Sequence, residues 1–245
     1  MELKPIRTDN SDPAFGRGVT YDAAELASAA QGQKVLRSTY LLLAATMVPT
    51  IVGAALGVQF AGVMMANPIL TFVLMFAAIM GLQFGIVANR NSGIGIALLF
   101  ILTFLMGAFL GPLLNIALAM SNGMALVGYA AAGTGVIFFA MGAVATTTKR
   151  DFSFMGKFLF VGMIALLIAI VANMFLKIPA LALTISTLVI VVFSLYLLYD
   201  LNRIVRGGET NYILATTGVY ISLLNIFSSL LQILLMLGGG GSSRD

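Results

Sequence analysis

The sequence predicts an all-α integral membrane protein built as a bundle of seven transmembrane helices. Three observations lead to this fold class: 60% of the 245 residues are hydrophobic, only 9% are charged, and the mean hydropathy is +1.05. Soluble domains carry roughly 25% charged residues. A water-soluble fold of this length has no interior large enough for so much apolar surface, so lipid has to be the solvent.

Seven apolar runs are each close to the ~20 residues that a helix needs to cross the hydrocarbon core. They are read as helices because the sequence lacks the alternating segments of a transmembrane barrel. In chain order, the predicted spans are Tyr40–Phe60, Ile69–Val87, Ile94–Leu114, Met124–Ala145, Phe158–Leu176, Ile178–Tyr199 and Ile213–Leu237.

The distribution of Lys and Arg predicts how the bundle is oriented. Of the 13 Lys and Arg residues, all but Lys177 and Arg244 precede the first span, follow the second, fourth or sixth span, or begin the fifth. Cytoplasmic segments of membrane proteins carry an excess of these residues. The N-terminus is therefore predicted to be cytoplasmic and the C-terminus periplasmic, which agrees with an odd number of spans.

The chain is predicted to have three parts. Residues 1–37 form a flexible cytoplasmic tail, residues 38–237 form the membrane domain, and residues 238–245 form a short C-terminal tail. The first part is polar and lacks an early apolar stretch, so a cleaved signal peptide is not expected. Within it, Tyr21–Gln31 is compatible with a short surface helix or with a disordered lead-in.

Glycines in the third and fourth spans predict sites of close helix contact. Gly107 and Gly111 lie on one helix face, and Pro112 is expected to bend or end the third span because proline has no N–H to donate. In the fourth span, the glycines indicate either tight packing or a broken helix that lines a cavity. These glycines are Gly128, Gly133, Gly135 and Gly142.

A stripe of small and polar residues runs along one face of the seventh span. Its members follow one another at intervals of four and three residues, which places them on one side of a helix. They are Gly218, Ser222, Asn225, Ser229 and Gln232. Such a stripe has to face protein or water. It predicts either hydrogen bonds between helices or a polar path for permeation.

Asp200 is the one carboxylate that reaches any of the apolar runs, and it lies at the cytoplasmic end of the sixth span. A charged group in a membrane span is costly unless it is paired or used. One interpretation is an ion pair with Arg203 at the helix end. The other is a protonatable gate between the sixth and seventh spans, with a protonation state that depends on burial and on the nearby arginines.

Composition argues against an enzyme. Histidine is absent, which rules out a Ser-His dyad and zinc-histidine sites. Cysteine is also absent, so neither disulfides nor a cysteine nucleophile are available. Tyr199-Asp200 has the form of half an intramembrane aspartyl protease site, but that chemistry needs a second carboxylate, and residues 212–243 contain none. We therefore expect no catalytic activity and no cofactor.

Four segments resemble the Bax inhibitor-1 family of seven-span membrane proteins. They are Gly107–Asn115 (GAFLGPLLN), Thr147–Phe154 (TTKRDFSF), Ser194–Ile204 (SLYLLYDLNRI) and Val219–Phe227 (VYISLLNIF). Further segments are similar to the bacterial branch that modulates the membrane protease FtsH, and they include Val35–Tyr40 and Gly207–Tyr212. The resemblance implies a multi-pass protein of the bacterial inner membrane.

The resemblance implies two activities. One is a pH-sensitive calcium leak closed by two aspartates on the sixth and seventh helices. Asp200 matches the first of these aspartates, and Ser222 stands at the place of the second. Glu209 is a candidate substitute, and Arg90 corresponds to an arginine latch on the second helix. With Asn225 of the polar stripe, these residues form the candidate proton or ion gate.

The other implied activity is binding and restraining FtsH, with the N-terminal tail and its cations Lys34 and Arg37 as the candidate binding region. We expect this role first, because Ser222 leaves the aspartate pair incomplete. The alternative is a cation leak gated by Asp200, and a third is a structural or stress-related membrane protein without transport. The expected partners are lipid, FtsH with its associated complex, and calcium or protons. Nucleic acid is not expected, because the net charge of +4 comes from cytoplasmic flanks.

Overall fold

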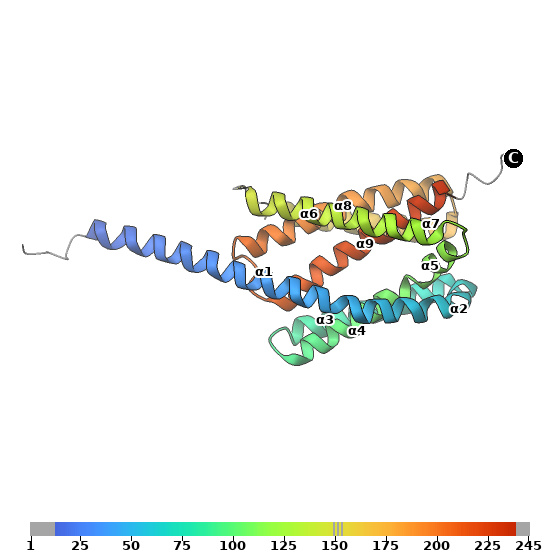
Figure 1. Ribbon diagram of the computed structural model, residues 1–245, viewed down its shortest axis with the longest axis horizontal. Coiled ribbons are helices and arrows are strands. Elements are labelled where there is room, and N and C mark those ends of the chain that lie inside the picture. Colours follow the sequence, from blue (N-terminus) through green and yellow to red (C-terminus); the bar gives the residue numbers. More distant parts are fainter. Residues whose placement is uncertain (1–12, 149, 151, 153, 239–245) are drawn as a thin grey trace, which may run out of the picture.

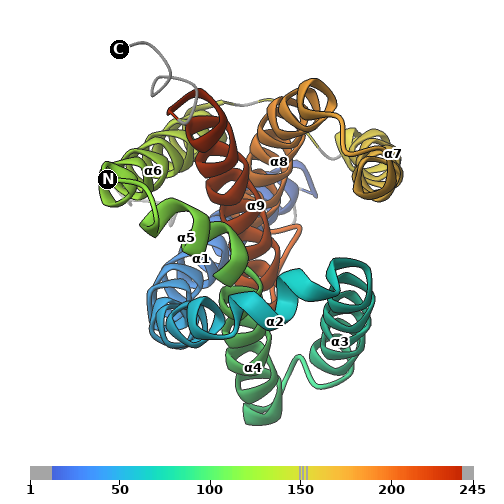
Figure 2. The same cartoon turned by 90° about the vertical axis from the view of Figure 1, so that its right-hand side faces the viewer.

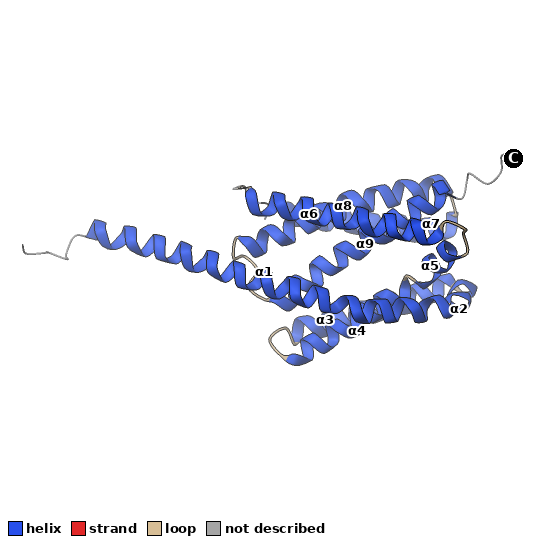
Figure 3. Ribbon diagram, viewed as in Figure 1, coloured by secondary structure: helices blue, strands red, loops and turns tan. Residues whose placement is uncertain are grey.

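The computed structural model describes residues 13–148, 150, 152 and 154–238, and this part of the chain folds into helices joined by short turns (Figures 1 and 3). The helices are α1 (Pro13–Gln59), α2 (Ala61–Ala66), α3 (Pro68–Ala88), α4 (Gly93–Phe109), α5 (Gly111–Leu118), α6 (Gly123–Thr147), α7 (Met155–Leu176), α8 (Pro179–Val205) and α9 (Tyr212–Gly238). Six are long and apolar enough to cross a membrane, and the bent pair α4 and α5 is a candidate for a seventh span. The predicted all-α membrane bundle is confirmed.

The predicted third span is broken at Pro112. Helix α4 ends at Phe109, and α5 begins at Gly111 with Pro112 in its first turn, at an angle of 41° to α4. A proline is tolerated in the first turn of a helix because the N–H that it lacks has no partner there. The expected bend is therefore confirmed at the residue that predicts it.

Helix α1 is much longer than the first predicted span. It runs for 47 residues from Pro13, and its N-terminal part extends away from the bundle (Figure 1). The structure thus has helix from Pro13 where the sequence predicted a flexible tail, and Tyr21–Gln31 lies inside this helix. Residues 1–12 and 239–245 lie outside the described part, and the division of the chain into three parts stays a prediction.

Helix α9, which corresponds to the seventh predicted span, lies in the middle of the bundle (Figure 2). It packs against α8, α6 and α1 and also contacts α3, α4 and α5. Its side chains Val219, Tyr220, Ile226 and Leu231 are almost completely buried. The central position explains why the polar face of this helix meets protein.

Glycines allow α1 and the α4–α5 pair to approach until their backbones touch. A Cβ atom on Gly53 would overlap the carbonyl oxygen of Phe104, and one on Gly107 would overlap that of Thr50. A Cβ on Gly111 would overlap the backbone of Gly57. The predicted close contact at Gly107 and Gly111 is confirmed, and their partners belong to α1.

The glycines of the fourth predicted span do not all lie at close helix contacts. A Cβ atom on Gly128 or Gly135 of α6 would have no described atom within 4 Å beyond its own neighbourhood in the helix, so tight packing is wrong at these two positions. The broken-helix interpretation is also wrong, since α6 runs without a break from Gly123 to Thr147. Glycine content alone does not distinguish a helix contact from a lipid-facing surface.

The turns after α3, α6 and α8 lie at one end of the bundle, together with the part of α1 that enters it (Figure 1). We call this the basic end. Its described cations are Lys34, Arg37, Arg90, Arg150, Lys157, Arg203 and Arg206, whereas Lys177 lies at the opposite end between α7 and α8. The charges are therefore segregated as the sequence indicates, and the side of the membrane that the basic end faces stays a prediction.

Candidate functional site

Asp200 lies near the end of α8, at the basic end, with its carboxylate directed at α9. Its side chain is partly buried, and a Cβ atom added to Gly218 of α9 would lie 2.6 Å from the Asp200 Oδ2 atom. Any larger residue at position 218 would therefore push against the carboxylate. The glycine that begins the polar stripe of α9 thus provides the space for the one acidic side chain of the spans.

Arg203 pairs with Glu209 and not with Asp200. The Arg203 Nη2 atom lies 3.2 Å from Glu209 Oε2, and the guanidinium also sits 5.5 Å from the ring centre of Tyr199. The predicted helix-end pair between Asp200 and Arg203 is therefore absent, because the loop after α8 supplies a competing carboxylate.

The same ion pair decides what Glu209 does. Its second oxygen, Oε1, accepts the backbone N–H of Asn211 at 2.9 Å, so both carboxylate oxygens are occupied by the turn that leads into α9. A carboxylate held in this way stabilises the turn between α8 and α9. The hydrogen bonds of the two Glu209 oxygens go to Arg203 and Asn211 and not to Asp200, and the role of Glu209 as a substitute for a second aspartate stays a prediction.

Ser222 lies one helical turn beyond Gly218 and is buried, with only 2% of its surface exposed. The stripe that contains it continues to the far end of α9, where Gln232 Oε1 accepts a hydrogen bond from the Ser186 hydroxyl of α8 at 2.9 Å. Asn225 instead donates to the Ile221 carbonyl of its own helix at 2.8 Å. The stripe thus contacts α8 at both of its ends, through the Asp200 carboxylate and through Ser186.

This arrangement limits the chemistry at Asp200. A lone carboxylate beside a glycine can take up and release a proton. It offers a divalent cation one anionic ligand, whereas calcium takes 6–8 oxygen ligands. No group of three or more acidic side chains gathers within the described residues. The geometry therefore suits proton exchange better than a stable calcium site.

Two asparagines hold the loops of the basic end in place, and the sequence analysis missed both. Asn202 of α8 accepts the N–H of Phe152 at 3.3 Å and donates to the carbonyl of Arg150 at 3.4 Å, across the loop between α6 and α7. Asn202 is almost fully buried. Its position two residues from Asp200 is the only signal in the sequence that marks it.

Asn211 plays the corresponding part on the other side of the basic end. Its amide donates to the carbonyl of Arg90 at 2.7 Å and to Asn91 Oδ1 at 2.8 Å. Its side-chain oxygen accepts the N–H groups of Ile213 and Leu214, which caps the start of α9. One side chain therefore joins the turn after α3 to the helix that receives Asp200.

Lys34 and Arg37 are exposed on α1 where this helix leaves the bundle, and nothing in the structure brings them to Asp200. Arg90 is exposed on the turn between α3 and α4. Near Lys34, Gly32 lets α1 approach the last turn of α8, because a Cβ there would lie 2.9 Å from the Ile204 carbonyl oxygen. The basic end thus gathers most of the predicted residues without forming one pocket.

Comparison of the sequence with known proteins shows which proteins this chain resembles. A family model described as "Inhibitor of apoptosis-promoting Bax1" matches residues 32–239. An "Uncharacterized membrane protein" of Vibrio cholerae is 43% identical over 201 residues, which cover 82% of this chain and 88% of the relative. An "Uncharacterized protein" of Neisseria meningitidis serogroup A is 42% identical over 209 residues, covering 84% of this chain and 92% of the relative.

A third relative has a descriptive name. It is the "Modulator of FtsH protease YccA" of Escherichia coli strain K12, which is 41% identical over 214 residues and covers 86% of this chain and 92% of the relative. The relative from a second Escherichia coli strain is named "Inner membrane protein YccA". The apolar helices and these relatives identify a bacterial inner-membrane protein. The chain belongs to the Bax inhibitor-1 family, in its bacterial branch that includes the FtsH modulator.

Proposed function

We propose that this protein binds the membrane-anchored protease FtsH and restrains it. The observation that carries the proposal is the 41% identity to the Escherichia coli modulator of FtsH over 86% of the chain. The family model matches residues 32–239, so the resemblance to the family includes the membrane helices. Two features of α1 suggest how a restraint of this kind would work.

The first feature is that α1 joins an extension outside the bundle to a span inside it without interruption (Figure 1). If the basic end is cytoplasmic, the extension is accessible to a protease that pulls its substrates by a free end. The helical residues 13–37 rise about 37 Å along the helix axis. A pulling force applied to this segment would act directly on the first span.

The second feature is the way α1 is anchored. Backbone contacts at Gly53, Gly57 and Gly107 bring it against α4, where even a methyl group would not fit. Close contact of this kind is a main source of helix association in lipid, since apolar side chains gain little by leaving lipid. Extraction of α1 would have to separate these backbones in a single step, which makes the bundle a poor substrate.

Tyr220 of the central helix α9 adds polar interactions to the contact between α1 and α4. Its hydroxyl group lies 2.8 Å from Thr50 Oγ1 of α1 and donates to the Thr103 carbonyl of α4 at 3.1 Å. The tyrosine is 1% exposed. Because one side chain joins three helices, α1 cannot leave without exposing polar groups to the membrane interior.

The test is FtsH proteolysis of a membrane substrate in proteoliposomes that also contain this protein. Deletion of residues 1–30 is expected to abolish the restraint, because it removes the segment that FtsH would engage. Deletion of residues 239–245 serves as the matched control and is expected to leave the restraint intact. Full restraint by the first deletion variant would contradict the role of residues 1–30, and a wild type that does not slow proteolysis would contradict the proposed function itself.

A second function, a cation leak gated by Asp200, is favoured by one observation. Within the described residues, Arg203 pairs with Glu209 and leaves Asp200 against Gly218 at the end of the polar stripe. A carboxylate in this position is able to change its charge with pH at the boundary of a polar helix interface. The resemblance to the Bax inhibitor-1 family supports the same role.

Calcium flux into liposomes at pH 6, 7 and 8 tests the leak. The wild type is expected to show a flux that changes with pH, and Asp200→Asn is expected to remove the pH dependence because an amide does not titrate. The variant should still restrain FtsH, which separates the two functions. A wild-type flux no greater than that of empty liposomes would exclude the leak and leave the restraint standing.

A further inference from the structure

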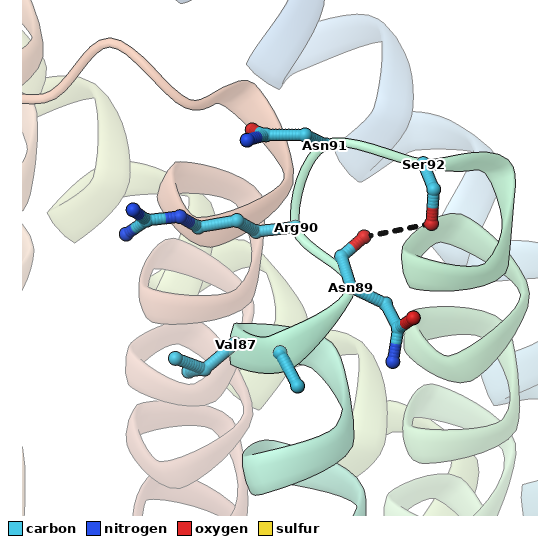
Figure 4. A pocket seen from close by; sticks show the side chains of 6 residues that line it. Val87, Asn89, Arg90, Asn91 and Ser92 are labelled. Atoms are coloured by element: carbon cyan, nitrogen blue, oxygen red, sulfur yellow. Dashed lines mark hydrogen bonds between the residues drawn. The ribbon is translucent and has the colours of Figure 1, made fainter.

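An open hollow of ≈ 560 Å³ lies at the turn between α3 and α4, away from Asp200, and is lined by residues 87–92 (Figure 4). The turn is fixed by its own polar groups. The Ser92 hydroxyl donates to the Asn89 carbonyl at 3.0 Å, and the Asn89 amide donates to the Gly85 carbonyl at 2.9 Å. The hollow therefore keeps its shape without a ligand.

The acceptors of this turn are largely used inside the protein. The Asn211 amide occupies both the carbonyl oxygen of Arg90 and the side-chain oxygen of Asn91. The charged group that remains is the guanidinium of the exposed Arg90, which carries five N–H donors and no acceptor. A hollow with occupied acceptors and a free cationic donor favours an anion as its ligand.

The side chains around the hollow point in two directions. Figure 4 shows Arg90, Asn91 and Val87 on one side of the turn, while Asn89 points to the other side. Val87 lies at the end of α3, so an apolar side chain is directly below the cation along the helix. A ligand on this side would meet a positive charge at one end and apolar surface at the other.

The apolar surface continues down α3 at helical spacing. Val73, Phe76, Met80, Phe84 and Val87 follow one another at intervals of three and four residues, and each is exposed, Phe84 by 75%. From Val87 to Phe76 the helix rises about 16 Å, which is close to half of a hydrocarbon core of ~30 Å. The length of this part of the stripe matches one leaflet of the bilayer.

The basic end as a whole also carries an excess of positive charge. Lys34, Arg37, Arg150 and Lys157 are exposed there together with Arg90. The described carboxylates at this end are Glu209, which is paired with Arg203, and the partly buried Asp200. The positive electrostatic potential at this end therefore favours lipids with anionic headgroups over lipids with zwitterionic headgroups.

We infer that the hollow at the α3–α4 turn and the α3 stripe beneath it form a binding site for an anionic phospholipid. The Arg90 guanidinium holds the headgroup phosphate in the two-point geometry that arginine adopts with phosphates. The acyl chains lie along the stripe from Val87 to Phe76. This inference is independent of the proposed restraint of FtsH and of the leak.

The test uses the full chain in phosphatidylcholine vesicles with chain-labelled lipids, and electron spin resonance measures which lipid occupies the protein surface. The wild type is expected to prefer phosphatidylglycerol to phosphatidylcholine. Arg90→Gln is expected to lower this preference about fivefold, which corresponds to ~1 kcal/mol for one basic residue at an anionic surface. Arg90→Lys should keep part of the preference, because lysine retains the positive charge but lacks the planar guanidinium group that binds phosphate at two points.

Lys157→Gln is the matched control, since it removes one exposed charge at the same end but on α7. It is expected to leave the preference nearly unchanged. An equal loss in both variants would overturn the inference and show that the attraction is a diffuse property of the basic end. Displacement of the labelled lipid by soluble glycerol phosphate would also overturn it, since the site would then bind the phosphate without the chains.

Discussion

Helix α1 and helix α3 are both spans on the outside of the bundle, yet they are attached in opposite ways. Helix α1 touches α4 backbone to backbone through glycines and is also bonded to α9 through Tyr220. Helix α3 packs mainly on α4 and is scarcely buried, and α7 is attached in a similar way to α8 (Figure 2). Hydropathy is nearly the same in the spans of α1 and α3, so small residues and buried hydroxyls determine which of the two is firmly held.

The difference in attachment suggests that the two kinds of helix have different roles. The helix that continues outside the bundle has the strongest anchor, which suits a protein that is proposed to resist pulling. The weakly attached helices offer their surfaces to lipid, and α3 carries the proposed phospholipid site. Three substitutions test whether the attachment of α1 differs from that of the outer helices α3 and α7.

The largest effect is expected for Gly107→Leu at the contact of α1 with α4. The added side chain meets the backbone of Thr50 and not a flexible group, so the helices have to separate. Overpacking costs typically 1–3 kcal/mol and occasionally more, and here we expect about 3 kcal/mol or more. Denaturant unfolding in detergent micelles measures the loss.

Gly128→Leu is its control, because a Cβ at position 128 has no described atom within 4 Å beyond its own neighbourhood in the helix. It should leave the free energy of unfolding within about 0.5 kcal/mol of the wild type, as is usual for surface positions. Similar losses in both variants would mean that leucine disturbs any span and that the α1–α4 contact is not special.

A medium effect is expected for Tyr220→Phe in the central helix. The variant keeps the ring but removes the hydroxyl that joins Thr50 to the Thr103 carbonyl. Because Thr50 keeps its hydrogen bond to the Thr46 carbonyl, we expect the loss of a typical buried hydrogen bond, about 0.5–1.5 kcal/mol. The same unfolding measurement applies, with Tyr129→Phe as the control because Tyr129 is exposed on α6. A loss no larger than that of the control would remove Tyr220 from the anchor of α1.

The smallest effect is expected for Phe160→Ala on α7. This side chain is exposed on a helix that packs mainly on α8, so lipid or detergent covers it before and after the substitution. The free energy of unfolding should change by less than about 0.5 kcal/mol. For comparison, a buried phenylalanine lost from a core costs about 3–5 kcal/mol. A loss of that size at position 160 would mean that α7 packs against something beyond α8.

Several features of the site could be read from the sequence because they depend on one segment alone. Asp200 is recognisable as the one acid of the spans, and the spacing from Gly218 to Gln232 predicts a polar helix face that meets protein. Pro112 predicts the bend between α4 and α5 because its missing N–H affects its own helix. Gly53 and Gly57 carried the same four-residue spacing as Gly107 and Gly111, and this signal was available but overlooked.

The membrane fold, the apolar helices and the segregation of Lys and Arg follow from the sequence alone, since hydropathy and charge are properties of each segment in its solvent. The three-dimensional structure was needed to show that Arg203 pairs with Glu209, that Asp200 lies against Gly218, and that α1 continues as a helix outside the bundle. Glycines at positions 107 and 128 look alike in sequence, yet one touches a neighbouring backbone and the other does not. Partner choice and close contact depend on which helices become neighbours, and that is settled by the packing of the whole bundle.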